Sequence, residues 1–249
     1  MQLPRTAPTR VAHSPIVELR QYTLHPGKRD VLIDLFEREF IESQEREGIE
    51  VIGQFRDLTD PDRFVWLRGF REMPARARAL EAFYTGPIWK AHRDAANETM
   101  VDSDNVLLLR PARPELGFPP GARRSPGTDE EPEGFVLATV YSLDAPPEAG
   151  LLKSFYETLQ PALASVGAFC LGVFVTEPSA NNFPRLPVRE GENVLVWFAR
   201  FPDRAAYERH AAALAQSPRW RWLTEELQPQ LRSPAQTLEL EPTSRSALH

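Results

Sequence analysis

The spacing of apolar and polar residues in the first half of the chain predicts two helices set among four strands. Apolar and polar residues alternate from Ile16 to Leu24, as in a half-buried strand. Apolar residues then recur at helical spacing from Val31 to Phe40, with charged residues on the other face. The strands are expected over 16–24, 49–58, 63–70 and 106–109. The helices are expected over 31–47 and from Pro74 to about Met100, with a break at Gly86-Pro87.

The second half of the chain repeats this pattern. Tyr22 and Gly48 are 26 residues apart, as are Tyr141 and Gly167. After an insertion of 12 residues in the second copy, five rare residues of the first copy recur 131 positions later. They are Trp66, Phe70, Pro87, Trp89 and Pro111, which match Trp197, Phe201, Pro218, Trp220 and Pro242. The second copy is expected to comprise strands 135–143, 168–176, 194–201 and 237–240, and helices 151–165 and 205–231. A repeat of this length indicates two copies of one small fold.

The order strand, helix, strand, strand, helix, strand is that of the ferredoxin-like unit. Its helices cover one face of the sheet and leave the other face bare. The segments 65–67 and 194–198 are apolar on both sides, which is typical of strands buried on both faces. We therefore expect an α+β protein in which tandem βαββαβ repeats form an intramolecular dimeric α+β barrel.

Proline and glycine mark the boundaries of the repeats. We expect a flexible N-terminal tail at 1–15, repeat 1 at 16–112, a proline-rich linker at 113–133, repeat 2 at 134–242 and a tail at 243–249. The stretch from Pro111 to Gly134 carries six prolines and favours neither helix nor strand. Residues 181–193 form a long loop between two strands of repeat 2, and loops of this length are often functional or mobile.

Composition narrows the class of protein. The formal net charge of −6 argues against a nucleic-acid surface. The single cysteine, Cys170, excludes an intrachain disulfide and is expected to be a small core residue. No apolar stretch approaches the length of about 20 residues that spans a membrane. We expect a cytoplasmic protein that forms an internal pseudo-dimer, with a higher homo-oligomer as an open alternative.

The opening strand resembles that of NIPSNAP proteins. The run from Val17 to Lys28, Val-Glu-Leu-Arg-Gln-Tyr-Thr-Leu-His-Pro-Gly-Lys, is similar to the opening signature of the NIPSNAP domain, and Trp66, Arg76, Arg78 and Pro87-Ile88-Trp89 fit its second half. The resemblance covers about residues 16–112 and is weaker over 134–242. It implies the dimeric α+β barrel fold. That superfamily also contains cofactor-independent monooxygenases, isomerases and haem-binding enzymes, so the resemblance does not define an activity.

Differences between the two copies indicate where a site lies. Polar residues that only one copy carries are not required by the fold. Glu18 and Arg20 share one face of the first strand, whereas the second copy has Leu137 and Thr139 at these positions. His92, Arg93 and Tyr84 likewise correspond to Leu223, Thr224 and Ala215. The first copy is therefore the expected location of any chemistry.

Each candidate residue has a functional and a structural interpretation. His92 could serve as a general base or an axial iron ligand, or be an ordinary helical histidine. Glu18 and Arg20 could orient a substrate or form a structural ion pair. Tyr22, Trp66, Tyr84, Trp89 and Arg93 are the candidate substrate-binding residues. Tyr22, Trp66 and Trp89 recur in the second copy, so packing also explains them. His210 aligns with Ala79 and is expected to face solvent.

No motif for metal, phosphate or nucleophilic-elbow chemistry is present. There is no zinc-ligand spacing, no glycine-rich phosphate loop and no Gly-x-Ser-x-Gly sequence. Strand 16–24 also lacks the asparagine that haem-degrading relatives carry. We therefore expect no metal and no cofactor, and binding of a small organic metabolite in a first-repeat pocket. A cofactor-independent monooxygenase or isomerase acting on a small, partly apolar compound is one alternative, and a haem-binding protein is another.

Overall fold

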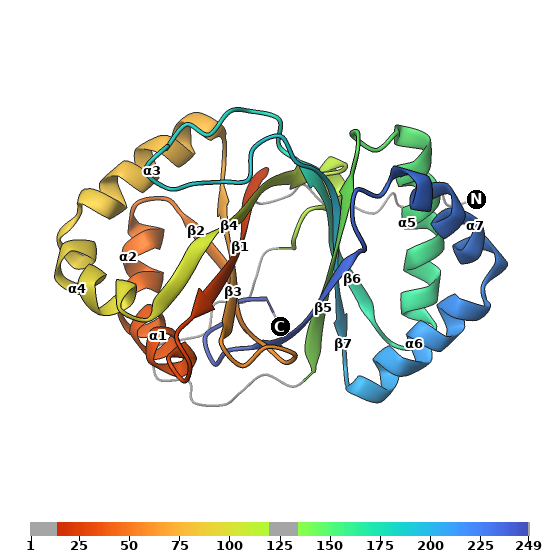
Figure 1. Ribbon diagram of the computed structural model, residues 1–249, viewed down its shortest axis with the longest axis horizontal. Coiled ribbons are helices and arrows are strands. Elements are labelled where there is room, and N and C mark those ends of the chain that lie inside the picture. Colours follow the sequence, from red (N-terminus) through yellow and green to blue (C-terminus); the bar gives the residue numbers. More distant parts are fainter. Residues whose placement is uncertain (1–13, 120–133, 249) are drawn as a thin grey trace, which may run out of the picture.

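The computed structural model describes residues 14–119 and 134–248. Most of the expected N-terminal tail, and residues 120–133 of the expected linker, lie outside the described residues. The described chain forms two helical layers with a β-barrel between them (Figure 1). Within the described residues, no helix is both long and apolar enough to cross a membrane.

The two repeats carry the same succession of elements. Repeat 1 consists of β1 (Ile16–Leu24), α1 (Arg29–Leu35), η1 (Phe36–Phe40), α2 (Ile41–Arg46), β2 (Glu50–Asp57), β3 (Arg63–Phe70), α3 (Met73–Thr85), α4 (Pro87–Asn97) and β4 (Met100–Pro111). The short helix η2 (Pro114–Leu116) follows. Repeat 2 consists of β5 (Phe135–Leu143), α5 (Ala149–Ala164), β6 (Phe169–Thr176), β7 (Asn193–Phe201), α6 (Arg204–Gln216), α7 (Pro218–Leu227), η3 (Gln228–Gln230) and β8 (Gln236–Pro242).

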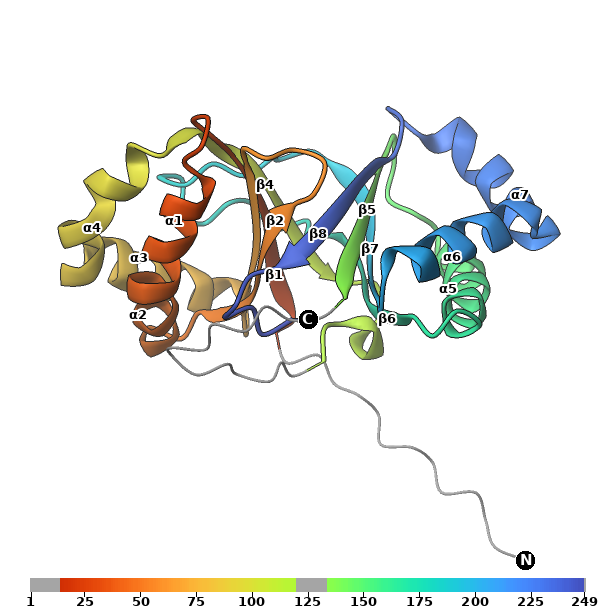
Figure 2. The same cartoon turned by 90° about the horizontal axis from the view of Figure 1, so that it is seen from below.

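The eight strands close into one barrel, in the order β1-β3-β2-β8-β5-β7-β6-β4. Each repeat contributes a four-stranded antiparallel sheet. The sheets join edge to edge where β2 pairs with β8 and β4 pairs with β6. Figure 2 shows β8 running along the seam between the repeats, with helices on both outer sides. The predicted intramolecular α+β barrel is confirmed, and closure leaves no sheet edge unpaired in it.

Strand alternation divides the interior into three layers. Val17 and Leu19 point into the barrel, where they pack with Phe174, Phe198 and Leu240 from the other repeat. The intervening residues of β1 and β3 point outward to the helices of repeat 1. The helices of repeat 2 cover their own sheet in the same way. The barrel is thus filled by apolar side chains, and the outward-facing residues of β1 and β3 are enclosed between sheet and helices.

The strand register reproduces the correspondence between the copies. Arg20 of β1 faces Trp66 of β3, and Thr139 of β5 faces Trp197 of β7. Matched residues of the two copies therefore occupy equivalent positions in the sheet, so a difference in residue type between them is a difference at the same structural position.

Several elements differ from the sequence-based expectation. Strand β4 begins at Met100 rather than at 106, because residues 102–105 are polar and none of the first six residues is buried, so this stretch gives no apolar signal. The start of the expected linker packs into the protein, since Leu116 and Phe118 are buried. The expected tail 243–249 is also packed as far as the structure describes it, because Leu248 lies in the barrel core.

His210 was expected to face solvent, and that prediction is wrong. The residue is 1% exposed, and its ring packs against Phe201 and Trp197. The surrounding alanines of α6 hid this burial, because small residues on a helix give a weak amphipathic signal.

Candidate functional site

One buried carboxylate holds three arginines together in repeat 1. Glu18 Oε2 accepts hydrogen bonds from Arg20 Nη1 at 2.6 Å and from Arg68 Nε at 2.7 Å. Glu18 Oε1 accepts one from Arg76 Nε at 2.6 Å. Glu18, Arg68 and Arg76 are 0% exposed, and Arg20 is 1% exposed. We call these four residues the arginine cluster.

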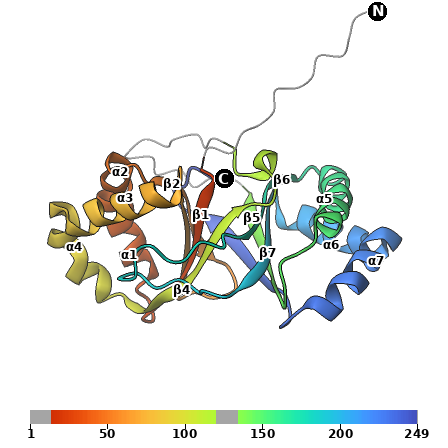
Figure 3. The ribbon, with the colours of Figure 1, turned by 90° about the horizontal axis from the view of Figure 1, so that it is seen from above.

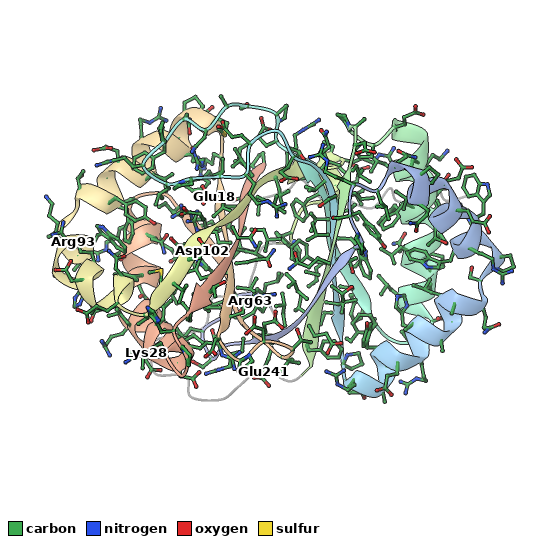
Figure 4. All side chains as sticks on the ribbon, viewed as in Figure 1. Glu18, Lys28, Arg63, Arg93, Asp102 and Glu241 are labelled. Carbon is green, nitrogen blue, oxygen red and sulfur yellow. The ribbon has the colours of Figure 1, made fainter. Side chains whose placement is uncertain are left out.

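Strand pairing and one helix bring the arginine cluster together. Glu18 and Arg20 are two residues apart on β1 and therefore share its outward face. Arg68 lies directly opposite Glu18 on β3. Arg76 reaches the same carboxylate from the first turns of α3, whose start is set by Pro74. Figure 4 shows Glu18 on β1, inside the layer formed by the first-repeat helices.

The cluster fixes the protonation state of its members. Burial alone raises the pKa of a carboxyl group, but the guanidinium groups of Arg68, Arg20 and Arg76 outweigh burial and hold the pKa of Glu18 well below its usual range. Glu18 is therefore a carboxylate at neutral pH. Burial also raises the pKa of Tyr22, although Arg20 opposes the shift. The Tyr22 phenol consequently stays protonated while its oxygen accepts a hydrogen bond from Arg20 Nε at 3.0 Å.

Three guanidinium groups and one carboxylate leave two positive charges in excess. The remaining partners of the cluster in the described structure are neutral. Arg76 Nη1 donates to Asn181 Oδ1 at 3.1 Å and to Asn182 Oδ1 at 2.7 Å. The Nη2 atoms of Arg68 and Arg76 are buried without a hydrogen-bond partner there. Buried charge without a counter-charge is unfavourable, so an additional negative charge at the cluster would be stabilising.

A small aromatic cavity adjoins the cluster. Its volume is about 30 Å³, which suffices for one or two water molecules. It is lined by Tyr22, Leu32, Phe36, Phe40, Gln44, Trp66, Phe83, Tyr84, Trp89, Ala96 and Met100. Arg68 borders it, because its Nη1 lies 3.4 Å from both Gln44 Oε1 and Tyr84 Oη. Arg20 and Arg68 also stand over the ring of Trp66.

A π-helical turn shapes one wall of this cavity. The helix between β1 and β2 is interrupted by η1 (Phe36–Phe40), whereas α5 of repeat 2 is α-helical throughout. π-Helical turns within α-helices are rare, and those that occur are often found at functional sites. Here the turn carries two of the aromatic rings that line the cavity, Phe36 and Phe40.

The long loop of repeat 2 covers the site of repeat 1. We call residues 181–186 the cover segment. Phe183 is buried and stacks on Tyr84 with ring centroids 6.0 Å apart. Asn182 Nδ2 donates to the Met73 carbonyl at 2.5 Å, and Arg185 pairs with Glu81. Figure 3 shows the connection between β6 and β7 reaching across to the first-repeat helices.

The structure brings together most, but not all, of the candidate residues. Glu18, Arg20 and Tyr22 interact directly, and Trp66, Tyr84 and Trp89 line the adjoining cavity. Arg93 is exposed and pairs with Asp94; Figure 4 shows it at the outer surface of α4, far from Glu18. His92 is 31% exposed, lies 3.5 Å from Glu39 and packs near Phe40. His92 and Arg93 are not among the cavity-lining residues.

Sequence reasoning missed Arg68 and the roles of Arg76, Gln44 and the cover segment. The comparison of the copies contained a signal for three of them. Arg68 corresponds to Ala199, Arg76 to Tyr207 and Gln44 to Leu163. Asn181 and Asn182 gave no such signal, because the insertion that carries them has no counterpart in repeat 1.

Other parts of the described structure offer less. A groove of about 650 Å³ lies between the end of β4, the start of α5 and the two ends of the long loop, but the charge of its Arg189 is already paired with Glu192. Burial raises the pKa of the Cys170 thiol to about 11, which disfavours a nucleophilic thiolate. The described residues contain no group of three or more histidine, cysteine or acidic side chains placed to hold a metal ion.

Comparison with protein families finds a match for the part of the chain that carries the cluster. Residues 17–114 match the NIPSNAP family model. The first repeat is a NIPSNAP domain. Because the match ends at residue 114, the second repeat is related to this NIPSNAP domain through the internal repeat and the shared topology. No curated protein matches the chain.

Solved structures with the same overall fold contain both repeats in a single chain. An anthrone oxidase-like protein is 14% identical, with a TM-score of 0.55 over 94% of this chain and 93% of its own. A putative monooxygenase from Lactobacillus acidophilus NCFM is also 14% identical, with a TM-score of 0.53 over 92% of this chain and 94% of its own. At this identity the likeness shows the fold alone. A NIPSNAP family protein from Agrobacterium tumefaciens is 23% identical, with a TM-score of 0.37 over 41% of this chain and 95% of its own.

Proposed function

We propose that this protein binds a small, partly apolar organic metabolite at the aromatic cavity of its NIPSNAP repeat. One observation carries the proposal. The polar residues that only the first copy has, namely Glu18, Arg20, Arg68 and Arg76, meet in one buried cluster beside that cavity. The second copy builds the same strand pair with Leu137, Thr139 and Ala199. The fold does not need these charges, so their retention beside a cavity favours a binding role.

The proposal is tested by a metabolite screen with thermal shift as the readout. Wild-type protein is compared with Tyr22→Phe and with its matched control, Tyr141→Phe. Both tyrosines occupy the same strand position, but only Tyr22 lines the cavity beside the cluster. We expect compounds that raise the melting temperature of the wild type to bind at least several-fold more weakly to Tyr22→Phe and unchanged to Tyr141→Phe. Equal effects of the two changes, or no binder at all, would contradict the proposal.

A cofactor-independent monooxygenase or isomerase is the second candidate, favoured by the state of Tyr22. Its phenol is protonated and accepts from Arg20, so its own O–H is free to donate to an oxygen that gains negative charge. Incubating each compound found in the screen with the protein, in air and without air, and measuring its mass and isomer composition tests this candidate. Unchanged compounds after prolonged incubation would leave binding as the function.

Haem fits the described residues poorly. A cavity of about 30 Å³ is far smaller than a porphyrin. His92 does not line it: the ring of His92 lies against Glu39 and against Phe40, which separates it from the cavity side. These contacts support a proposal without a cofactor. The direct measurement is a haem titration of wild type and His92→Ala, in which we expect no sharp Soret band that depends on His92.

A further inference from the structure

Two guanidinium groups of the arginine cluster share one carboxylate. An arginine fork commonly binds both oxygens of a carboxylate. Here Arg68 Nε donates to Glu18 Oε2 and Arg76 Nε donates to Glu18 Oε1, so each of these two arginines binds only one oxygen. Each guanidinium is left with its Nη2 buried and without a partner in the described structure. The cluster therefore holds two unused donors on groups that both carry a full positive charge.

The acceptors next to these donors are weak ones. Arg76 Nη1 is met by the amide oxygens of Asn181 and Asn182, which carry no net charge. Arg68 Nη1 lies 3.4 Å from Gln44 Oε1 and Tyr84 Oη, at the long limit for a hydrogen bond. Glu18 is the one acidic side chain that interacts with the cluster in the described parts of the chain. A negatively charged ligand would have a favourable electrostatic interaction with Arg68 and Arg76 that the neutral amide and hydroxyl groups do not provide.

We propose that the site takes a small organic carboxylate. Its anionic group binds Arg68 and Arg76 and displaces the amide oxygens of Asn181 and Asn182. Its apolar body occupies the aromatic cavity beside Trp66. The proposal rests on the proposed function and names the chemical class of its ligand.

The cover segment gives this ligand a route of entry. A cavity of about 30 Å³ is too small for an aromatic ring, which needs roughly 150 Å³. Phe183 stacks on Tyr84, a cavity-lining residue, so withdrawal of Phe183 opens the cavity wall. Of the polar contacts that hold the segment, the pair Arg185–Glu81 lies at the surface, with both side chains more than half exposed, and others join Asn181 and Asn182 to Arg76. Loss of the Asn182–Arg76 contact to a ligand carboxylate therefore loosens the segment that covers the site.

The charge requirement is tested with matched pairs of acids and amides. Benzoate is compared with benzamide, and phenylacetate with phenylacetamide, by calorimetric titration of the full chain. The members of each pair have nearly the same shape and differ in charge. We expect each acid to bind at least tenfold more tightly than its amide, and inorganic phosphate to compete weakly because it has no apolar body.

The outcomes separate this proposal from the proposed function. Equal binding of acid and amide, or a metabolite screen that yields neutral compounds only, overturns the carboxylate assignment and leaves the cavity as a binding site. Phosphate binding as tight as the acids overturns the role of the apolar cavity. Absence of any binder in both the screen and the pairs overturns both proposals.

A second variant supplies the anion from within the protein. Asn182→Asp places a carboxylate where Asn182 Oδ1 now lies 2.7 Å from Arg76 Nη1. The change also removes the hydrogen bond that Asn182 Nδ2 donates to the Met73 carbonyl, so affinity is the readout, and we expect benzoate binding to weaken at least tenfold. Asn97→Asp adds the same charge at an exposed position of α4 and should leave benzoate affinity unchanged. Unaltered benzoate affinity in Asn182→Asp would refute the displacement of Asn182 by the ligand.

Discussion

Glu18 on β1 and Arg68 on β3 stand directly opposite each other, with Glu18 Oε2 accepting a hydrogen bond from Arg68 Nε at 2.7 Å. The corresponding pair in repeat 2 is Leu137 and Ala199, in the same register. The same pair of strand positions is thus occupied by a charged pair in repeat 1 and by an apolar pair in repeat 2. The difference between them makes the role of the charged pair measurable.

Removing the carboxylate alone should be strongly destabilising. Glu18→Gln leaves three buried guanidinium groups without a counter-charge, and breaking a buried ion pair from one side costs about 3 to 5 kcal/mol. Because the pKa of Glu18 is depressed in the fold, its stabilising effect is present above its ordinary value of 4.5 and is lost as the pH falls below that value. Urea unfolding should therefore show a large deficit for Glu18→Gln at neutral pH that shrinks in acid. A deficit independent of pH would contradict this account.

Replacing the whole arginine cluster should be tolerated. The fourfold change Glu18→Leu, Arg20→Thr, Arg68→Ala and Arg76→Tyr installs the residues that repeat 2 has at these positions. Because apolar groups often replace buried ion networks at no loss, we expect the free energy of unfolding to stay within about 2 kcal/mol of the wild type. Ligand binding should disappear. A variant that unfolds while Glu18→Gln does not would show that the cluster is structural.

Weakening the cover segment should loosen it locally. Phe183→Ala removes the ring that stacks on Tyr84, and we expect faster amide hydrogen exchange in 181–186 and in α3, with exchange in the barrel strands unchanged. Phe169→Ala is the matched control, because Phe169 is 65% exposed. Faster exchange throughout the barrel in Phe183→Ala would show that the segment is part of the global core instead.

The buried His210 should make the protein sensitive to acid. Burial lowers the pKa of His210, so the neutral ring stabilises the fold above the ordinary value of 6.5, and this contribution is lost as the pH falls through the lowered value. His210→Leu should remove that part of the acid sensitivity in a series of unfolding curves. The reciprocal change at the matching position, Ala79→His, should introduce it. Identical pH profiles for wild type and His210→Leu would contradict the prediction.

The last residues of the described chain should contribute to stability. Thr243 N donates to the Gln54 carbonyl at 2.9 Å, Gln54 N donates to Ser246 Oγ at 3.2 Å, and Leu248 is 3% exposed. Ending the chain after Pro242 removes these contacts and should cost about 2 to 4 kcal/mol. Removing residue 249 alone is the control. A truncated protein with wild-type unfolding behaviour would restore the interpretation of 243–249 as a free tail.

The fold was predictable from the sequence because the repeat and the alternation of apolar residues report on packing. Strands β1, β3 and β5 have the expected bounds. The exposed start of β4 was not predictable, because pairing of polar residues such as Asn105 with Gln21 leaves no periodic signal. Burial of Leu116, Phe118 and Leu248 was hidden by the prolines and polar residues around them.

The site was predictable only in part. Comparing the two copies identified Glu18, Arg20 and Tyr84, because a charge or hydroxyl that one copy lacks stands out against a common frame. The same comparison singled out His92 and Arg93, which lie at or near the helix surface, where substitutions are tolerated and carry little information. Asn181 and Asn182 lie in an insertion without a counterpart, so their contact with Arg76 follows only from the three-dimensional arrangement.

The pairing of β2 with β8 determines when the barrel is completed during synthesis. The two strands are about 180 residues apart in the chain. At ribosomal rates of about 5 to 20 residues per second, β2 waits on the order of 10 to 40 s for its partner. During that interval it is an open edge, the kind of surface at which chains aggregate. The last strand to be made is thus the one that shields the first repeat, so heterologous expression should benefit from slow synthesis or chaperones more than the size of the protein alone would suggest.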